Sequence, residues 1–172
     1  IKKLLLPIYN KNLIFLKNKE IERALMQNSF VESFKIKKKY PNTLKIEIYE
    51  KKPIAIIQDK KNKYLYSDNN ELIIYDESKE FDNLPLVFGK KKDFETFFKN
   101  LKKIDFPLNQ IKTYYFFEAK RWDLETKNGQ IIKLPITNYS ESLINFLELK
   151  NQHNFEKYKI FDYRIKNQVI LK

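Results

Sequence analysis

The feature that most constrains the fold is a stretch in which apolar and polar residues alternate. Residues 44–49 read Leu-Lys-Ile-Glu-Ile-Tyr. Successive side chains of a strand point to opposite faces, so this alternation predicts a half-buried β-strand. Residues 31–39 are also expected to form a strand, and residues 40–43 between them (Tyr-Pro-Asn-Thr) are typical of a turn. The sequence therefore predicts a β-hairpin near the N-terminus.

Helical segments are expected before this hairpin. Residues 4–8 resemble the end of a helix that Pro7 stops. Asn18 is expected to cap a helix over 19–27, and Asn28 to end it in a left-handed conformation. One helix and two strands are a small core. Because the chain does not begin with Met, we expect further elements to precede its first residue.

From residue 54 onward the sequence predicts mostly short strands. The charged segment 50–53 is taken as the boundary, which gives domains of residues 1–52 and 53–172. The clearest hairpin is centred on Asn128-Gly129, a dipeptide that is expected to supply the positive φ angles of a tight turn. The strands are predicted over residues 54–58, 64–67, 71–75, 84–88, 111–118, 122–126, 130–134, 158–165 and 169–171.

Two amphipathic helices are expected among these strands. The first follows from the i, i+3, i+4, i+7 spacing of Phe94, Phe97, Phe98 and Leu101. The second is predicted over residues 140–150. Its expected inward side chains are Leu143, Ile144, Phe146 and Leu147.

The residue inventory argues against catalysis and metal binding. Cysteine is absent, and His153 is the only histidine, in a polar stretch that looks like an exposed loop. Thiolate chemistry is therefore impossible, and a transition-metal site or a catalytic triad is disfavoured. With only Gly89 and Gly129, a glycine-rich phosphate loop cannot form. The acidic pairs Asp76/Glu77 and Glu118/Asp123 could serve as acid and base, but nothing in the sequence distinguishes them from ordinary surface carboxylates. We expect a non-enzyme without a cofactor or a small-molecule substrate.

The net charge of +12 comes from 34 Lys and Arg against 22 Asp and Glu. Most of the excess is Lys, with abundant Asn and Ile and few Gly and Ala, a composition typical of an A/T-rich coding sequence. Lys35, Lys37 and Lys39 share one face of a predicted strand, which indicates a solvated strand surface. Because no recognition motif accompanies the charge, nucleic-acid binding is not favoured. No window approaches the length of a membrane span.

Residues 30–55 carry a run of motifs that resembles a known bacterial family. Phe30-Val31 enters a basic strand, Tyr-Pro-Asn-Thr-Leu follows at 40–44, and Glu-Lys-Lys-Pro-Ile-Ala occupies 50–55. In this order and spacing they resemble the POTRA module of the FtsQ/DivIB family of cell-division proteins.

The second part of the chain resembles the same family. The matching segments are the expected hairpin at 64–72, with Asn70 where the family has Gly, the Leu-Pro-Leu-Val-Phe-Gly run at 84–89, the Arg-Trp-Asp-Leu hairpin at 121–135, and Phe-Asp-Tyr-Arg at 161–164. Tyr163 departs from the family's Leu. The resemblance spans essentially the whole chain, and the five motifs occur in the family's order.

The resemblance implies an α+β fold: a truncated POTRA domain (helix and strand hairpin), then a β domain of mostly antiparallel strands with two flanking helices. The family's first strand and most of its first helix would precede this chain. The implied function is that of a non-enzymatic divisome scaffold that binds FtsB and FtsL and helps to recruit and regulate septal peptidoglycan synthesis. The implied location is the bacterial inner membrane at the division septum. This region would lie in the periplasm, and a single N-terminal membrane helix would lie outside the chain.

By the same resemblance, the last strand region accepts FtsB. A C-terminal strand can end a sheet with unpaired backbone groups, to which a partner segment can add as a further strand. The alternative is that Val169–Leu171 simply closes the core. The expected partner-binding residues are Arg121, Tyr163, Arg164, Ile165, Asn167 and Val169.

Two other functional classes remain open from the sequence. One is a POTRA-containing chaperone-like protein, or a secretion or outer-membrane assembly module, which would usually carry several POTRA repeats or a long barrel. The other is a basic nucleic-acid-binding domain, whose affinity would depend steeply on salt.

Overall fold

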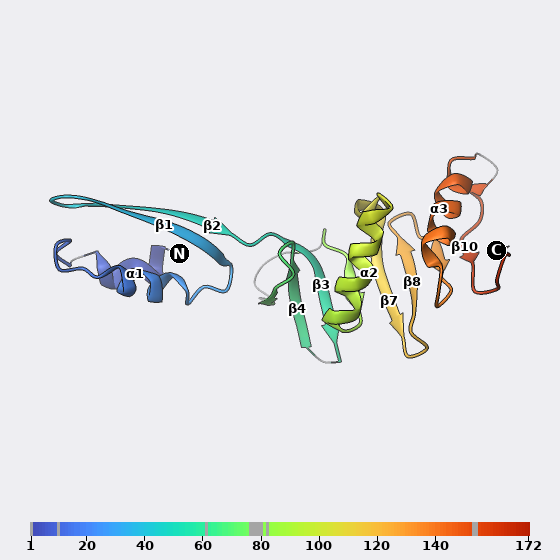
Figure 1. Cartoon of the computed structure of the whole chain (residues 1–172), viewed down its shortest axis with the longest axis horizontal. Coiled ribbons are helices and arrows are strands. Elements are labelled where there is room, and N and C mark those ends of the chain that lie inside the picture. Colours follow the sequence, from blue (N-terminus) through green and yellow to red (C-terminus); the bar gives the residue numbers. More distant parts are fainter. Residues whose placement is uncertain (1, 10, 61, 76–80, 82, 153–154) are drawn as a thin grey trace. The chain divides into compact units, whose positions relative to one another are not determined.

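The computed structural model describes residues 2–9, 11–60, 62–75, 81, 83–152 and 155–172. The chain divides into two compact units, one formed by residues 1–52 with 67–74 and the other by residues 53–66 with 75–172. Figure 1 shows the helices and strands of both units. Each unit has its own apolar core, so each is described by itself.

The first unit is built on the predicted hairpin. Strand β1 (Val31–Lys39) pairs antiparallel with β2 (Thr43–Glu50), and the Tyr40–Pro41 peptide between them is cis. The 3₁₀ helix η1 (Lys2–Ile8) and helix α1 (Asn18–Leu25) precede the hairpin, and β5 (Leu72–Ile74) also belongs to this unit. The core is formed by Ile8, Leu13, Leu16, Ile21 and Leu25, against which the inward residues of both strands pack. The alternation read from the sequence thus marks the covered face of the hairpin.

The ends of the helices differ from the prediction. Asn18 is the first residue of α1 rather than its cap, because Lys17 takes the extended cap conformation while the Glu20 side chain accepts from the Lys17 backbone N–H. The helix ends at Leu25, and Met26 stays right-handed, so Asn28 does not provide a left-handed stop. Pro7 lies inside η1 instead of ending an α-helix.

The second unit is a mixed sheet with helices packed on it. Its strands lie in the order β11-β10-β9-β8-β7-β6-β3-β4. Neighbours β7/β8, β8/β9 and β10/β11 are antiparallel, whereas β3/β6, β6/β7 and β9/β10 are parallel. Their bounds are β3 (Pro53–Asp59), β4 (Asn62–Ser67), β6 (Leu86–Phe88), β7 (Ile111–Phe117), β8 (Arg121–Thr126), β9 (Ile131–Lys133), β10 (Ile160–Asp162) and β11 (Ile170–Leu171).

Helix α2 (Lys91–Lys103) packs on this sheet through the predicted stripe, whose Phe94, Phe97, Phe98 and Leu101 are all buried. The ring of Phe97 stacks on that of Trp122 with centroids 4.7 Å apart. Aromatic pairs of this kind add to the free energy of burial. Trp122 is therefore a core residue of the second unit. The short 3₁₀ helix η2 (Leu108–Gln110) then leads into β7.

Helix α3 (Tyr139–Lys150) meets α2 at its first residue, where the Asn100 amide of α2 donates to the Tyr139 hydroxyl at 2.6 Å. Its inward face differs from the prediction at one position, because Leu143, Phe146 and Leu147 pack on the core as predicted and Ile144 does not. Leu143 and Phe146 are buried, and the Phe146 ring meets that of Phe161 edge to face at 4.9 Å. Ile144, predicted to face inward, is 44% exposed because it lies one residue off this face.

Two turns contain a residue with positive φ, and Gly89 is a position of close packing. Asn70, where the resembling family has Gly, has φ of 64°, a left-handed conformation that Asn tolerates well. In the Asn128-Gly129 turn only Gly129 has positive φ, so the prediction of two such angles was wrong. At Gly89 a Cβ would lie 3.0 Å from that of Phe116, so glycine allows a close approach there.

Candidate partner-binding edge

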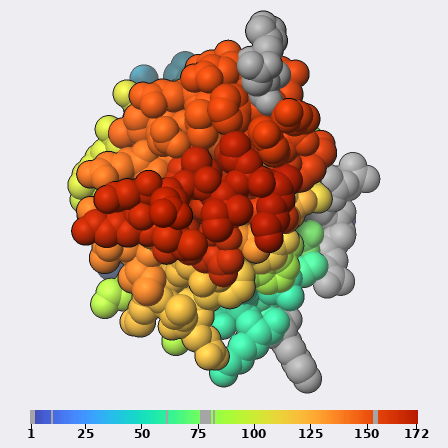
Figure 2. Space-filling view, turned by 90° about the vertical axis from the view of Figure 1, so that its right-hand side faces the viewer, coloured from blue at the N-terminus to red at the C-terminus, as the bar shows by residue number. Residues whose placement is uncertain are grey.

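The C-terminal residues form one border of the second unit. In Figure 2 the last residues of the chain (red) run as a continuous band across the face turned to the viewer, beside the orange atoms of the α3 region. In the sheet order, β11 is the terminal strand on this side and β10 lies between β9 and β11. The free edge therefore belongs to β11, and β10 is an interior strand.

The hydrogen-bond pattern of β11 shows which backbone groups face outward. Lys172 donates to the Ile160 carbonyl at 3.1 Å, and Ile160 donates to the Lys172 carbonyl at 2.9 Å. Lys172 and Ile160 thus form a hydrogen-bonded pair. In an antiparallel ladder such pairs alternate with residues whose N–H and C=O point away from the partner strand. Leu171, between Lys172 and Ile170, therefore directs its backbone groups to the free edge. An added strand could bond to them.

A groove of about 680 Å³ lies next to this edge. One wall comes from the connection between β9 and α3 together with the first turns of α3, and the other from the loop 163–169 that leads to β11. Tyr163 anchors this loop, because its backbone N–H donates to Lys133 at 2.9 Å and its hydroxyl bonds the Asn145 amide oxygen at 3.1 Å. The lining residues are Pro135, Ile136, Thr137, Asn138, Glu141, Ser142, Asn145, Tyr163, Arg164, Ile165, Lys166, Asn167, Gln168 and Val169.

Five of the six predicted partner-binding residues line this groove; Arg121 does not. Tyr163 is buried, and burial raises the pKa of its hydroxyl, so it stays protonated. Ile165 is 50% exposed, as a contact residue should be. Asn167 has φ of 59° in the loop, and Val169 is partly buried and packs on the core. The groove residues thus divide into anchors of the fold and side chains open to a partner.

A row of charges connects Arg121 to the groove. In the strand register Asp123 lies opposite Lys133, and Lys133 lies opposite Asp162 on the next strand. Arg121 donates from Nε to Asp123 Oδ1 at 3.2 Å, and Arg164 donates from Nη2 to Asp162 Oδ2 at 2.6 Å. These five residues form a charged row across β8, β9 and the end of β10, with three cations and two carboxylates.

The pKa values of the two carboxylates in the row are shifted in opposite directions. The Arg164 guanidinium, which donates to both Asp162 oxygens, holds the pKa of Asp162 below its usual value. Burial raises the pKa of Asp123, although Arg121 opposes the shift. The hydrogen bonds hold each arginine against an aspartate two residues away.

The prediction from sequence missed Asp123, Lys133 and Asp162. The i, i+2 spacing of Arg121 and Asp123 places both on one face of β8, and Asp162 and Arg164 have the same spacing, with Arg164 just beyond the end of β10. This spacing could have found the two aspartates. The place of Lys133 between the carboxylates depends on strand register, which the sequence does not reveal.

Within the described residues, no group of three or more His, Cys, Asp or Glu side chains could hold a metal ion. His153 and the pair Asp76/Glu77 lie outside the described residues. In the other acidic pair, Glu118/Asp123, the Asp123 carboxylate accepts a hydrogen bond from Arg121. The described part of the chain also contains no helix long and apolar enough to span a bilayer.

Comparison with known proteins decides the family. The family profile "POTRA domain, FtsQ-type" matches residues 1–51, and "Cell division protein FtsQ/DivIB, C-terminal" matches residues 55–164. The chain belongs to the FtsQ/DivIB family of cell-division proteins. The recognition from sequence and the α+β fold class, with a POTRA domain and a β domain, are confirmed.

Individual FtsQ proteins show the same relationship. The chain is 28% identical over 180 residues to the cell division protein FtsQ of Rickettsia conorii, covering 95% of this chain and 64% of that protein. It is 29% identical over 161 residues to FtsQ of Rickettsia bellii, covering 87% and 57%. This chain therefore spans somewhat under two thirds of the length of these relatives.

A structural comparison finds the major extracytoplasmic domain of DivIB from Geobacillus stearothermophilus, with a TM-score of 0.40 and 13% identity. The match covers 57% of this chain and 89% of that one.

Proposed function

We propose that this chain is the extracytoplasmic part of a non-enzymatic divisome scaffold, and that the edge of β11 accepts an extended segment of FtsB, with FtsL as a further partner. It would help to recruit and regulate septal peptidoglycan synthesis. The observation that carries the proposal is the outward-facing backbone of Leu171 beside a groove of about 680 Å³. The proposed location is the inner membrane at the septum, with this region in the periplasm. The proposed domain boundary is that between residues 52 and 53.

Backbone pairing and side-chain contacts have separate roles in this proposal. An added strand gains main-chain hydrogen bonds from Leu171, while alternate side chains set specificity. The exposed Ile165 side chain offers apolar contact in the groove. Arg121 and Arg164 supply positive charge, and their aspartate partners keep both guanidinium groups oriented. A partner segment with apolar and acidic side chains fits this surface.

A pair of substitutions at Leu171 separates backbone from side-chain effects. Leu171→Pro removes an outward N–H but keeps the two backbone hydrogen bonds between Lys172 and Ile160. It should therefore weaken FtsB binding at least tenfold. Leu171→Ala keeps the N–H and is the control, with a smaller expected loss. Binding is measured by calorimetry against the periplasmic segment of FtsB, and folding by circular dichroism. Equal affinities of a folded Leu171→Pro variant and the unaltered chain would refute strand addition at this edge.

A further inference from the structure

The turn end of the β1–β2 hairpin exposes apolar side chains next to lysines. Ile14 is 63% exposed and Phe15 79%, both in the loop between η1 and α1. Tyr40, in the hairpin turn, is 63% exposed. Large apolar side chains that gather in one exposed area mark interaction surfaces more often than scattered ones do. This end of the first unit is therefore a candidate docking surface.

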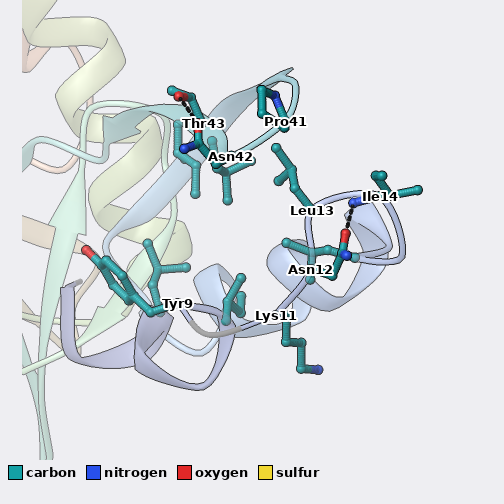
Figure 3. Close-up of a pocket in the computed structure, with 13 residues that line it drawn as sticks. Tyr9, Lys11, Asn12, Leu13, Ile14, Pro41, Asn42 and Thr43 are labelled. Carbon is teal, nitrogen blue, oxygen red and sulfur yellow. Dashed lines mark hydrogen bonds between the residues drawn. The ribbon is translucent and has the colours of Figure 1, made fainter.

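The loop and the hairpin turn lie around one groove of about 650 Å³ (Figure 3). Leu13 is buried and points toward the turn at Pro41, whereas the Ile14 side chain extends outward from the loop. The Lys38 ammonium, which donates to the Leu16 carbonyl, also ties the loop to β1. The exposed apolar residues are thus held at one end of the unit by the fold itself.

Lysines lie on the outer face of the hairpin, opposite the face that packs on the core, and several of them are close to its turn. Lys37 lies directly opposite Lys45 in the strand register, and Lys39 lies opposite Thr43. Like charges opposite each other destabilise a strand pair. Lys45 is paired with Glu47 at 2.8 Å, whereas Lys37 and Lys39 have no acidic partner within the described part of the chain. Their charge is therefore free to attract an anionic surface.

We propose that this hairpin-end surface (Ile14, Phe15, Lys37, Lys39, Tyr40 and Lys45) docks on a lipid bilayer that contains anionic headgroups. Two observations favour a bilayer over a nucleic acid. The cations are lysines, which act as point charges on an anionic surface rather than as bidentate readers of phosphates. The apolar side chains can enter the headgroup region, where tyrosine is also favoured. This docking goes beyond the partner binding proposed above and does not depend on it.

The test is co-sedimentation of the whole chain with vesicles of phosphatidylcholine alone, or of phosphatidylcholine with phosphatidylglycerol. Binding should require the anionic lipid and weaken with salt. The triple variant Lys37→Gln, Lys39→Gln, Lys45→Gln should lose roughly fivefold per lysine, on the order of a hundredfold in total. The matched control is Lys90→Gln, Lys91→Gln, Lys92→Gln, which removes equal charge at the start of α2 and should bind nearly as well as the unaltered chain.

A second measurement tests entry of the apolar side chains and does not rely on loss of binding. In Phe15→Trp the new indole should shift to shorter emission wavelength on anionic vesicles, against the constant background of buried Trp122. An equal loss in both triple variants, binding to neutral vesicles at the same affinity, or an unshifted Phe15→Trp spectrum on bound vesicles would each overturn the proposal. Binding of an oligonucleotide at the same affinity, with the same dependence on the hairpin lysines, would identify a general polyanion surface and also overturn it.

Discussion

Replacing Asp162 with Asn tests whether the charged row holds Arg164 at the groove. The Asp162 carboxylate accepts from Arg164 Nε at 2.8 Å, from Nη2 at 2.6 Å and from the Arg164 backbone N–H at 3.1 Å. Charge-assisted bonds of this kind contribute about 1.5–3 kcal/mol when well shielded. The Arg164 side chain is 43% exposed, so solvent screening reduces the expected loss in Asp162→Asn to about 1 kcal/mol.

The pH dependence gives the sharper test. Because the folded-state pKa of Asp162 lies below its ordinary value, its contribution is present above that ordinary value and is lost as pH falls through the folded pKa. The loss of unfolding free energy in Asp162→Asn should therefore be complete at neutral pH and should become smaller as the pH falls. Lys133 and Arg164 are the charged groups that face this carboxylate.

Asp123→Asn is the matched control, because its effect on the free energy of unfolding should depend on pH in the opposite direction. Burial raises the folded-state pKa of Asp123, so its contribution is present below the ordinary value and is lost as pH rises through the folded pKa. Relative to the unaltered chain, Asp123→Asn should gain stability as pH rises. Urea unfolding followed by Trp122 fluorescence, from neutral pH to about pH 2.5, measures both variants. A pH-independent deficit in Asp162→Asn, or the same pH trend in both variants, would refute this reasoning.

Two further predictions concern the core of the second unit. The Tyr114 hydroxyl is buried without a hydrogen-bond partner among the described residues, so Tyr114→Phe should raise the free energy of unfolding by about 1 kcal/mol; a loss of similar size in urea titrations would reveal a partner. Phe146→Ala should cost about 3–4 kcal/mol because it removes the ring packed on Phe161, whereas Ile144→Ala on the exposed side of α3 should cost less than about 0.5 kcal/mol. Equal losses in these two α3 variants would contradict the observed orientation of the helix.

The regular parts of the fold could be predicted because their periodicity is strong. The alternation along 44–49 and the four-residue stripe of α2 each identified an element and its covered face. In α3, adjacent Leu143 and Ile144 are both apolar, so the pattern did not decide which one faces inward; contact of Phe146 with β10 decides it. Helix caps depend on local hydrogen bonds, and Lys17 therefore took the place expected for Asn18.

The candidate site was only partly accessible from sequence. The resemblance to the family placed Tyr163, Arg164, Ile165, Asn167 and Val169, and the fold brings all five around one groove. The expectation that the C-terminal strand ends the sheet came from the resemblance, whereas the sequence could not reveal that β10 is interior, because strand order depends on long-range pairing. The same pairing brings Lys133 between Asp123 and Asp162.

The most direct test of the scaffold proposal is a calorimetric titration of the folded chain with the periplasmic segments of FtsB and FtsL from the same species, at two salt concentrations. We predict binding of about micromolar affinity or tighter that persists at higher salt and is weakened by Leu171→Pro and by Ile165→Lys. Absence of binding by the folded chain, or binding that both variants leave unchanged, would contradict the account and favour a chaperone-like or assembly role for the POTRA domain.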